Sequence, residues 1–322
     1  MPVTVGVIRE AAPGEARVAI VPEVAKKLAN AKARVLIEAG AAGRAHIADA
    51  ELAGAATMVA GPGAVLAEAG VLLRVQPPSL AEAAALKPGS VVIGYLKPHL
   101  QHDLIRLFCE RKITSFAMEL VPRISRAQSM DALSSQAAVA GYKAVLLGAA
   151  ALDKFLPMLT TAAGTIRPSL ALIMGAGVAG LQAIATARRL GAIVEAFDVR
   201  AATKEQVESL GAKFVDTGVS ADGAGGYARE LTAEERQKQQ SVVNERVAKA
   251  DLVITTAAVP GRPAPRLIDR ATVERMKPGA VIVDLGADSG GNCELTRPGE
   301  TVVHQGVTII GLLDLATTVP RH

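Results

Sequence analysis

The sequence is poor in aromatic side chains. Only 2% of its 322 residues are Phe, Trp or Tyr, and Trp does not occur. The hydrophobic cores must therefore consist of Ala, Val, Leu and Ile, as the cores of parallel α/β sheets often do. The scarcity of aromatic stacking platforms also argues against a protein that binds single-stranded nucleic acid.

Cysteine is nearly as scarce. The two cysteines, Cys109 and Cys293, lie far apart and show no metal-ligand spacing. This pattern predicts a reducing, cytoplasmic compartment and no metal site. His99 and His102 lie three residues apart, but no acidic or cysteine cluster accompanies them, and we interpret them as solvated helix residues.

Long hydrophobic runs and blocks of one charge are also lacking. The most apolar stretch, residues 137–152, is interrupted by Lys143 and is too short to span a bilayer, so we expect no membrane insertion. The N-terminus has neither the basic nor the apolar region of a signal peptide. The net charge of +4 is spread among interleaved acids, which indicates no nucleic-acid surface and favours attraction to anionic cofactors.

Short apolar runs alternate with helical patterns along the whole chain. We expect strands at residues 3–8, 33–37, 71–75, 91–95, 170–174, 193–198, 213–215, 252–256 and 281–284. This alternation predicts an α/β protein with two Rossmann-like, doubly wound parallel-sheet domains and a cleft between them. The expected domains are residues 1–130, joined by the C-terminal segment 305–322, and residues 131–304.

Several helix starts can be read from local signals. Pro22 suits the first position of a helix. The segments 79–82 and 232–235 have the spacing of a capping box, in which a Ser or Thr precedes a Glu by three residues. A long helix is expected from about Gln136 to Phe155.

A glycine-rich loop follows the apolar run 170–174. The loop reads Gly175-Ala176-Gly177-Val178-Ala179-Gly180, and a helical segment follows. The first glycine allows the tight turn, the second lets the backbone approach a pyrophosphate, and the third allows close helix packing. A glycine turn in a non-binding α/β protein is the competing interpretation.

Asp198 ends the next apolar strand, eighteen residues after Gly180. Its carboxylate would accept hydrogen bonds from the adenosine ribose and repel a 2′-phosphate, which predicts NAD(H) over NADP(H). Arg200 leaves the alternative open, because an arginine there can accommodate a phosphate.

Several longer motifs carry a family resemblance. They occupy residues 123–135, 174–192, 197–200, 225–228, 256–265 and 290–294. Together they resemble the NAD(H)-binding alpha component of proton-translocating NAD(P) transhydrogenase, a family related to alanine dehydrogenase. The likeness covers nearly the whole chain. Family members continue for several tens of residues past the position of His322, so the first domain or the dimer contact is expected to differ.

The resemblance implies two groups of site residues. Arg123, Gln128 and Asp131, with Ser134 nearby, would contact the nicotinamide ribose and carboxamide and form the catalytic group. The implied NAD(H) contacts are Gly175, Gly177, Val178, Ala179, Gly180, Asp198, Val199, Arg200, Gly226, Tyr227, Thr256, Ala257 and Ala258. Direct hydride transfer between two nicotinamides moves no proton at the reacting carbons, so it needs positioning groups and not a general base.

The resemblance also implies an assembly. The chain would form a homodimer at the cytoplasmic face of the inner membrane. It would dock there on a beta subunit that carries NADP(H) and on a membrane domain. The full complex would couple hydride transfer to proton translocation, whereas this chain would supply only the NAD(H) side.

Two other functions stay open. An alanine dehydrogenase-like enzyme would need a proton acceptor and cationic contacts for a substrate carboxylate. In that branch a Lys stands where this chain has Gln76 and a His where it has Lys97, although Arg17 and Asp288 match. The second alternative is a non-catalytic subunit that senses NAD(H).

Overall fold

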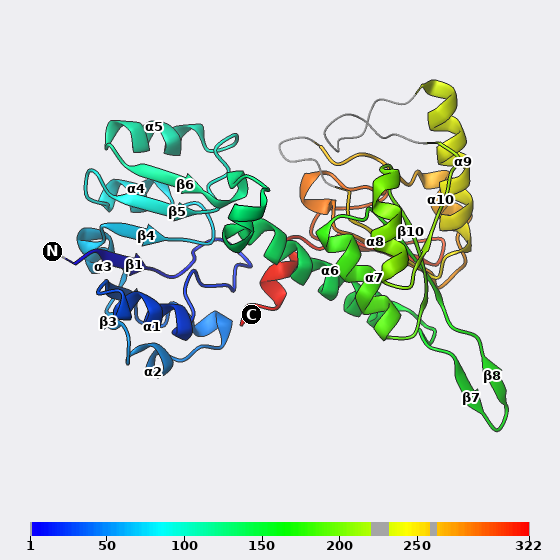
Figure 1. The fold of residues 1–322 in the computed structure, drawn as a ribbon, viewed down its shortest axis with the longest axis horizontal. Helices are drawn as coiled ribbons and strands as arrows, with labels where there is room; N and C mark the ends of the chain where they lie inside the picture. The colour runs from blue at the N-terminus through cyan, green and yellow to red at the C-terminus, as the bar shows by residue number, and fades with distance from the viewer. Residues whose placement is uncertain (1, 220–231, 258–262, 322) are drawn as a thin grey trace. The chain divides into compact units, whose positions relative to one another are not determined.

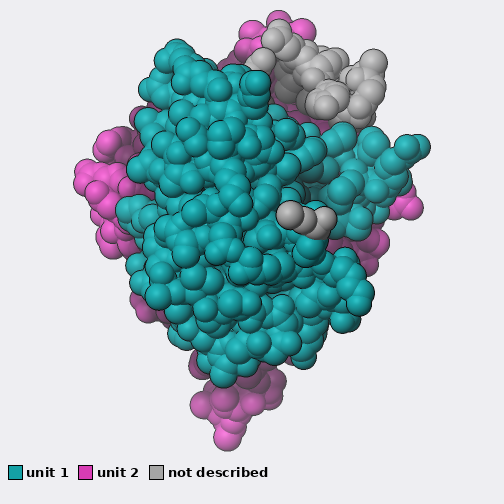
Figure 2. Space-filling view, turned by 90° about the vertical axis from the view of Figure 1, so that its left-hand side faces the viewer, with its two compact units in different colours: residues 1–135, 317–322 teal, residues 136–316 magenta. Residues whose placement is uncertain are grey.

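The computed structural model describes residues 2–219, 232–257 and 263–321. They form two compact units, which Figure 2 shows in different colours. Unit 1 comprises residues 1–135 and 317–322, and unit 2 comprises residues 136–316. The segment expected to return to the first domain was 305–322, whereas the strand Val307–Ile310 belongs to the sheet of unit 2.

Unit 1 is built on a parallel sheet. Its strands are β1 (Thr4–Val7), β2 (Arg34–Glu38), β3 (Thr57–Val59), β4 (Val71–Leu73), β5 (Val91–Gly94) and β6 (Thr114–Ala117). They lie in the order β3-β2-β1-β4-β5-β6, and every neighbouring pair is parallel (Figure 1). The order reverses between β1 and β4, and doubly wound sheets bind ligands at such a switch point. The α-helices of this unit before residue 132 are α1 (Pro22–Asn30), α2 (Asp49–Leu52), α3 (Pro62–Glu68), α4 (Leu80–Ala85) and α5 (His102–Glu110).

Unit 2 repeats this order in a larger sheet. Its strands are β9 (Leu170–Met174), β10 (Ile193–Phe197), β11 (Lys213–Phe214), β12 (Leu252–Thr255), β13 (Val281–Asp284), β14 (Thr301–His304) and β15 (Val307–Ile310). The order is β11-β10-β9-β12-β13-β15-β14, and among the strands that the structure describes here only the edge pair β14–β15 is antiparallel. The switch point therefore lies between β9 and β12. Figure 1 also shows the hairpin of β7 (Leu159–Thr161) and β8 (Gly164–Ile166), which extends away from this sheet.

Helices cover both faces of the unit 2 sheet. The helices are α6 (Ala132–Ala151), α7 (Val178–Arg189), α8 (Lys204–Ser209), α9 (Ala233–Lys249) and α10 (Arg270–Glu274). Strand β9 contributes Ala171 and Ile173 to a core with residues of α6 and α7, and Leu172 and Met174 to a second core with residues of α9. Since successive side chains of a strand point to opposite faces, both faces of β9 are buried. This two-sided burial explains its continuous apolar sequence and confirms the α/β, Rossmann-like fold.

The local helix signals have the expected geometry in three places. Pro22 occupies the first turn of α1. The Ser79 hydroxyl accepts a hydrogen bond from the Glu82 N–H, and Thr232 does the same for Glu235, so both capping boxes form. Among the described residues, no helix has both the length and the apolar character that crossing a bilayer requires.

Helix α6 differs from the helix expected between about residues 136 and 155. It begins at Ala132 and ends at Ala151. The start is earlier because the Asp131 carboxylate accepts a hydrogen bond of 2.8 Å from the Ser134 N–H, as a residue preceding a helix does when it caps the first turn. The polar segment before residue 136 therefore supplies the first turn of the helix.

Candidate functional site

The glycine loop connects β9 to α7 at the switch point of unit 2. Gly175 has φ +105°, a conformation that side chains other than glycine rarely adopt, and a Cβ there would lie 2.4 Å from the Thr256 Oγ1. A Cβ on Gly180 would lie 1.8 Å from the Gly175 carbonyl oxygen. Both glycines are therefore needed for the loop and the first turn of α7 to pack against the end of β12.

Gly177 differs from these two glycines. It precedes α7 with φ −79° and ψ −170°, and a Cβ on it would meet no atom within 4 Å. No side chain caps the N-terminus of α7 at this position. The space around the Cβ position of Gly177, at the start of the helix, is therefore open. This arrangement fits the close approach of a phosphate group.

Asp198 follows β10 and lies beside this loop. Its carboxylate accepts hydrogen bonds from the Ala176 N–H at 2.7 Å and from the Arg200 N–H at 2.9 Å. The Arg200 guanidinium adds two more, from Nε to Oδ1 and from Nη2 to Oδ2, each 2.9 Å. Burial opposes ionisation of Asp198, but these hydrogen bonds outweigh it and hold its pKa below the usual value. The structure thus brings Asp198, Arg200 and the glycine loop together.

Thr256 and Ala257 follow β12, next to the glycine loop. The Thr256 hydroxyl donates to the Gly175 carbonyl oxygen at 3.1 Å. The Asn292 side-chain amide donates two hydrogen bonds. One goes to the Ala257 carbonyl oxygen at 2.8 Å, and the other to the Pro265 carbonyl oxygen at 2.7 Å. Asn292 is fully buried and therefore fixes both positions. Sequence reasoning assigned it no role, although the Gly-Gly-Asn segment 290–292 stood among the family motifs.

A buried carboxylate at the end of β13 supports the same region. Asp284 accepts five hydrogen bonds of 2.6–3.0 Å, two from threonine hydroxyls and three from backbone N–H groups. The donors are Thr255, Gly286, Asn292, Cys293 and Thr296. Asp284 thus ties the last residue of β12 to the loop that carries Asn292. Its only sequence signal was an acid at the end of an apolar strand.

Helix α6 also packs against the glycine loop. A Cβ on Gly141 would lie 2.1 Å from the Ala179 carbonyl oxygen, so a larger residue has no room there. Val178 is 44% exposed, while Val199 is partly buried against the second core of unit 2. The predicted NAD(H) contacts Gly226, Tyr227 and Ala258 lie outside the described residues.

The predicted catalytic group lies in unit 1. Arg123 and Gln128 are exposed, and Gln128 belongs to the 3-10 helix Ser125–Met130 that precedes Asp131. The Ser134 hydroxyl donates to the Asp131 carboxylate at 2.6 Å. Hydrogen bonds from Ser134, with a smaller contribution from the charge of Arg123, lower the pKa of Asp131. The structure therefore brings Asp131 and Ser134 into contact and sets Arg123 near them.

The switch point of unit 1 contains a carboxylate and no glycine loop. The Glu10 side chain accepts hydrogen bonds from the Val75 N–H at 2.7 Å and the Gln76 N–H at 3.2 Å. Arg74 pairs with Glu10 at 3.2 Å, and both side chains are at most 2% exposed. The backbone donors after β4 are therefore satisfied within the chain.

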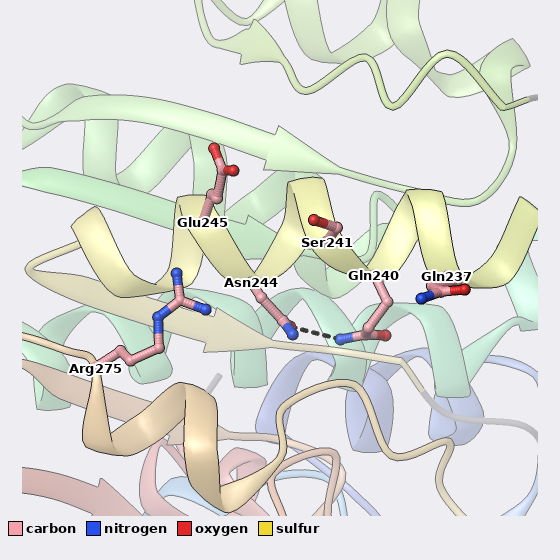
Figure 3. Close-up of a pocket in the computed structure, with 6 residues that line it drawn as sticks. All are labelled: Gln237, Gln240, Ser241, Asn244, Glu245 and Arg275. Atoms are coloured by element: carbon pink, nitrogen blue, oxygen red, sulfur yellow. Dashed lines mark hydrogen bonds between the residues drawn. The ribbon is translucent and has the colours of Figure 1, made fainter.

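A pocket of about 360 Å³ lies along α9. It is lined by Gln237, Gln240, Ser241, Asn244, Glu245 and Arg275 (Figure 3). Gln240 and Asn244 hydrogen-bond to each other at 2.7 Å along the helix. None of the predicted site residues that the structure describes lines this pocket.

Comparisons with known proteins agree with the fold and the motifs. The family models "Alanine dehydrogenase/PNT" match residues 6–140 with the N-terminal domain and 144–322 with the C-terminal domain. An NAD(P) transhydrogenase subunit alpha protein from Rhodospirillum rubrum is 49% identical over 325 residues, which cover 98% of this chain and 85% of that protein.

Two solved structures support the same placement. A transhydrogenase from Sinorhizobium meliloti has 44% identity and a TM-score of 0.89, and the match covers 99% of this chain and 89% of that chain. An L-alanine dehydrogenase has 27% identity and a TM-score of 0.81, and the match covers 99% and 84%. The chain therefore belongs to the alanine dehydrogenase/PNT family, and within it is more similar to NAD(P) transhydrogenase subunit alpha than to alanine dehydrogenase.

Proposed function

We propose that this chain binds NAD(H) in unit 2 and exchanges a hydride with NADP(H) held on a partner subunit. The observation that carries the proposal is the switch point of unit 2, where Gly177 leaves room for a phosphate and Asp198 lies beside the loop. A carboxylate at this position accepts bonds from a ribose diol and repels a 2′-phosphate, so it favours NAD(H).

The residues in unit 1 would position the nicotinamide half. Bound NADH supplies the hydride, and no proton moves at the reacting carbons. Gln128 offers a donor and an acceptor on one amide, which suits a carboxamide. Arg123 offers fixed donors for a pyrophosphate or a carboxamide. Hydrogen bonds from Ser134 lower the pKa of Asp131, and the Asp131 carboxylate would accept a hydrogen bond from a ribose hydroxyl. We keep these four residues as proposed contacts.

A network in unit 1 argues against amino-acid deamination. The Gln76 side-chain amide donates to Glu15 at 2.8 Å, and Lys97 donates to the side-chain amide oxygen of Gln76 at 3.1 Å. Arg17, which matches a position used by alanine dehydrogenase, pairs with Glu15 at 2.7 Å. The pKa of Glu15 is about 2, because hydrogen bonds from Arg17 and Gln76 outweigh the effect of burial. The arginine thus already has an internal carboxylate.

The assembly follows from the same proposal. The relatives named as subunit alpha imply a complementary subunit, and we propose that this partner carries NADP(H). We further propose a homodimer that attaches to a membrane domain at the cytoplasmic face. In that complex, hydride transfer would be coupled to proton translocation.

A mixing experiment tests the proposed activity. The chain is mixed with an NADP(H)-binding transhydrogenase component, and reduction of an NADP⁺ analogue by NADH is followed spectroscopically. We expect turnover in the mixture and none with either protein alone. NADH binding without turnover in the mixture would instead favour a sensing subunit. As a second arm, the chain alone with pyruvate, ammonium and NADH should form no alanine, and measurable alanine would contradict the proposal.

A further inference from the structure

Groups of the protein itself take up the acceptor positions of the Asp198 carboxylate. A carboxylate offers about four in-plane acceptor positions, two on each oxygen. The backbone N–H groups of Ala176 and Arg200 take one position on each oxygen. The Arg200 guanidinium takes the other two through Nε and Nη2. Every position is therefore filled by the protein itself.

The guanidinium occupies the positions that a ribose would need. The vicinal hydroxyls of an adenosine ribose form a pair of donors, and a pair of donors binds both oxygens of one carboxylate. The two backbone N–H groups are fixed by the glycine loop and the end of β10, so they stay. The guanidinium is on a flexible side chain that is 39% exposed, whereas the Asp198 side chain is only 6% exposed. Arg200 is thus the donor that can leave.

We propose that Arg200 competes with the adenosine ribose of NAD(H) for Asp198 and thereby sets both the affinity for NADH and the discrimination against NADPH. This inference rests on the proposed NAD(H) site. While paired, Arg200 offsets the negative charge that would repel a 2′-phosphate. When a ribose displaces it, the positive charge is still within reach of the 2′ position. The Arg200 side chain therefore weakens the binding of NADH and makes the binding of NADPH less unfavourable.

The test uses two substitutions of Arg200 in the full chain. Arg200→Ala removes both the two guanidinium donors that bind Asp198 and the positive charge. Arg200→Lys keeps the charge but loses the planar pair of donors, because an ammonium binds as a point charge. Arg246→Ala is the matched control, since Arg246 is 37% exposed and pairs at 3.1 Å with the nearly buried Glu195 of β10. Binding of NADH and NADPH is measured by isothermal titration calorimetry at one ionic strength.

Competition predicts opposite changes for the two nucleotides. Arg200→Ala should bind NADH about two- to fivefold more tightly, the range that a half-exposed ion pair contributes, and should bind NADPH more weakly. Arg200→Lys should also tighten NADH binding but should keep NADPH binding near the wild-type value. Arg246→Ala should change neither affinity.

Other outcomes overturn the inference. Weaker or unchanged NADH binding by Arg200→Ala would show that Arg200 supports the site and does not compete for it. If Arg200→Ala lost affinity for NADH and NADPH equally, and Arg200→Lys did not restore it, Arg200 would have a structural role. If the wild-type chain itself binds no NADH, the proposed function fails first. These results are distinguishable in one set of titrations.

Discussion

Gly177→Val is expected to weaken NADH binding by about 100-fold or more and to leave the fold intact. The added side chain would fill the space where a Cβ meets no atom within 4 Å. It would keep a phosphate from the N–H groups of α7, and each lost hydrogen bond to a charged group costs about 1.5–3 kcal/mol. Because φ is −79° and ψ −170°, valine adopts the backbone without strain, and the melting temperature should fall by at most about 4 °C.

Gly180→Ala provides the contrast. Its Cβ would lie 1.8 Å from the Gly175 carbonyl oxygen, so the loop or α7 must shift, and the protein should unfold at a lower temperature. The measurements are NADH fluorescence titration and thermal unfolding by circular dichroism. Gly177→Val with wild-type affinity for NADH would contradict the assignment of the phosphate site to this loop.

Asp284→Ala should give the largest loss of stability. It leaves five donors without their acceptor in a site where Asp284 is 1% exposed, and removal of one partner of a buried charged interaction costs about 3–5 kcal/mol. The melting temperature of unit 2 should fall by about 6–20 °C. Asp284→Asn keeps one acceptor oxygen, so its melting temperature should fall by less than that of Asp284→Ala.

Glu300→Ala is the matched control for this change. It removes the same charge in the same unit, but its side chain is 60% exposed, so the free energy of unfolding should change by less than about 0.5 kcal/mol. Thermal unfolding of the three variants and the wild type decides the question. Similar melting temperatures for Asp284→Ala and Glu300→Ala would mean that the hydrogen-bond network around Asp284 contributes little.

Features encoded by neighbouring residues could be predicted from the sequence. The glycine loop, the apolar run of β9 and the capping box at Ser79 each depend on residues a few positions apart. The alternation of such segments was enough to predict two parallel α/β units, because crossover connections constrain how successive parallel strands can be arranged.

Contacts between distant residues could not be predicted in this way. Asn292 hydrogen-bonds to Ala257 and Pro265, which lie 35 and 27 residues away. Gly141 reads as an unfavourable residue inside a helix, and only its packing against Ala179 explains why it is there. The pairing of Arg200 with Asp198 is local, but an arginine at that position could equally have pointed to a phosphate.

The carboxylate at the switch point of unit 1 bears on stoichiometry. Both units share a strand order whose switch point binds ligands in doubly wound sheets, and in unit 1 the backbone donors after β4 already bind the side chain of Glu10. The Glu10 carboxylate thus occupies the donors that a phosphate would need, and it is paired with Arg74. A dinucleotide phosphate would have to displace a buried ion pair to bind. A chain with two such sheets should therefore bind one nucleotide and not two.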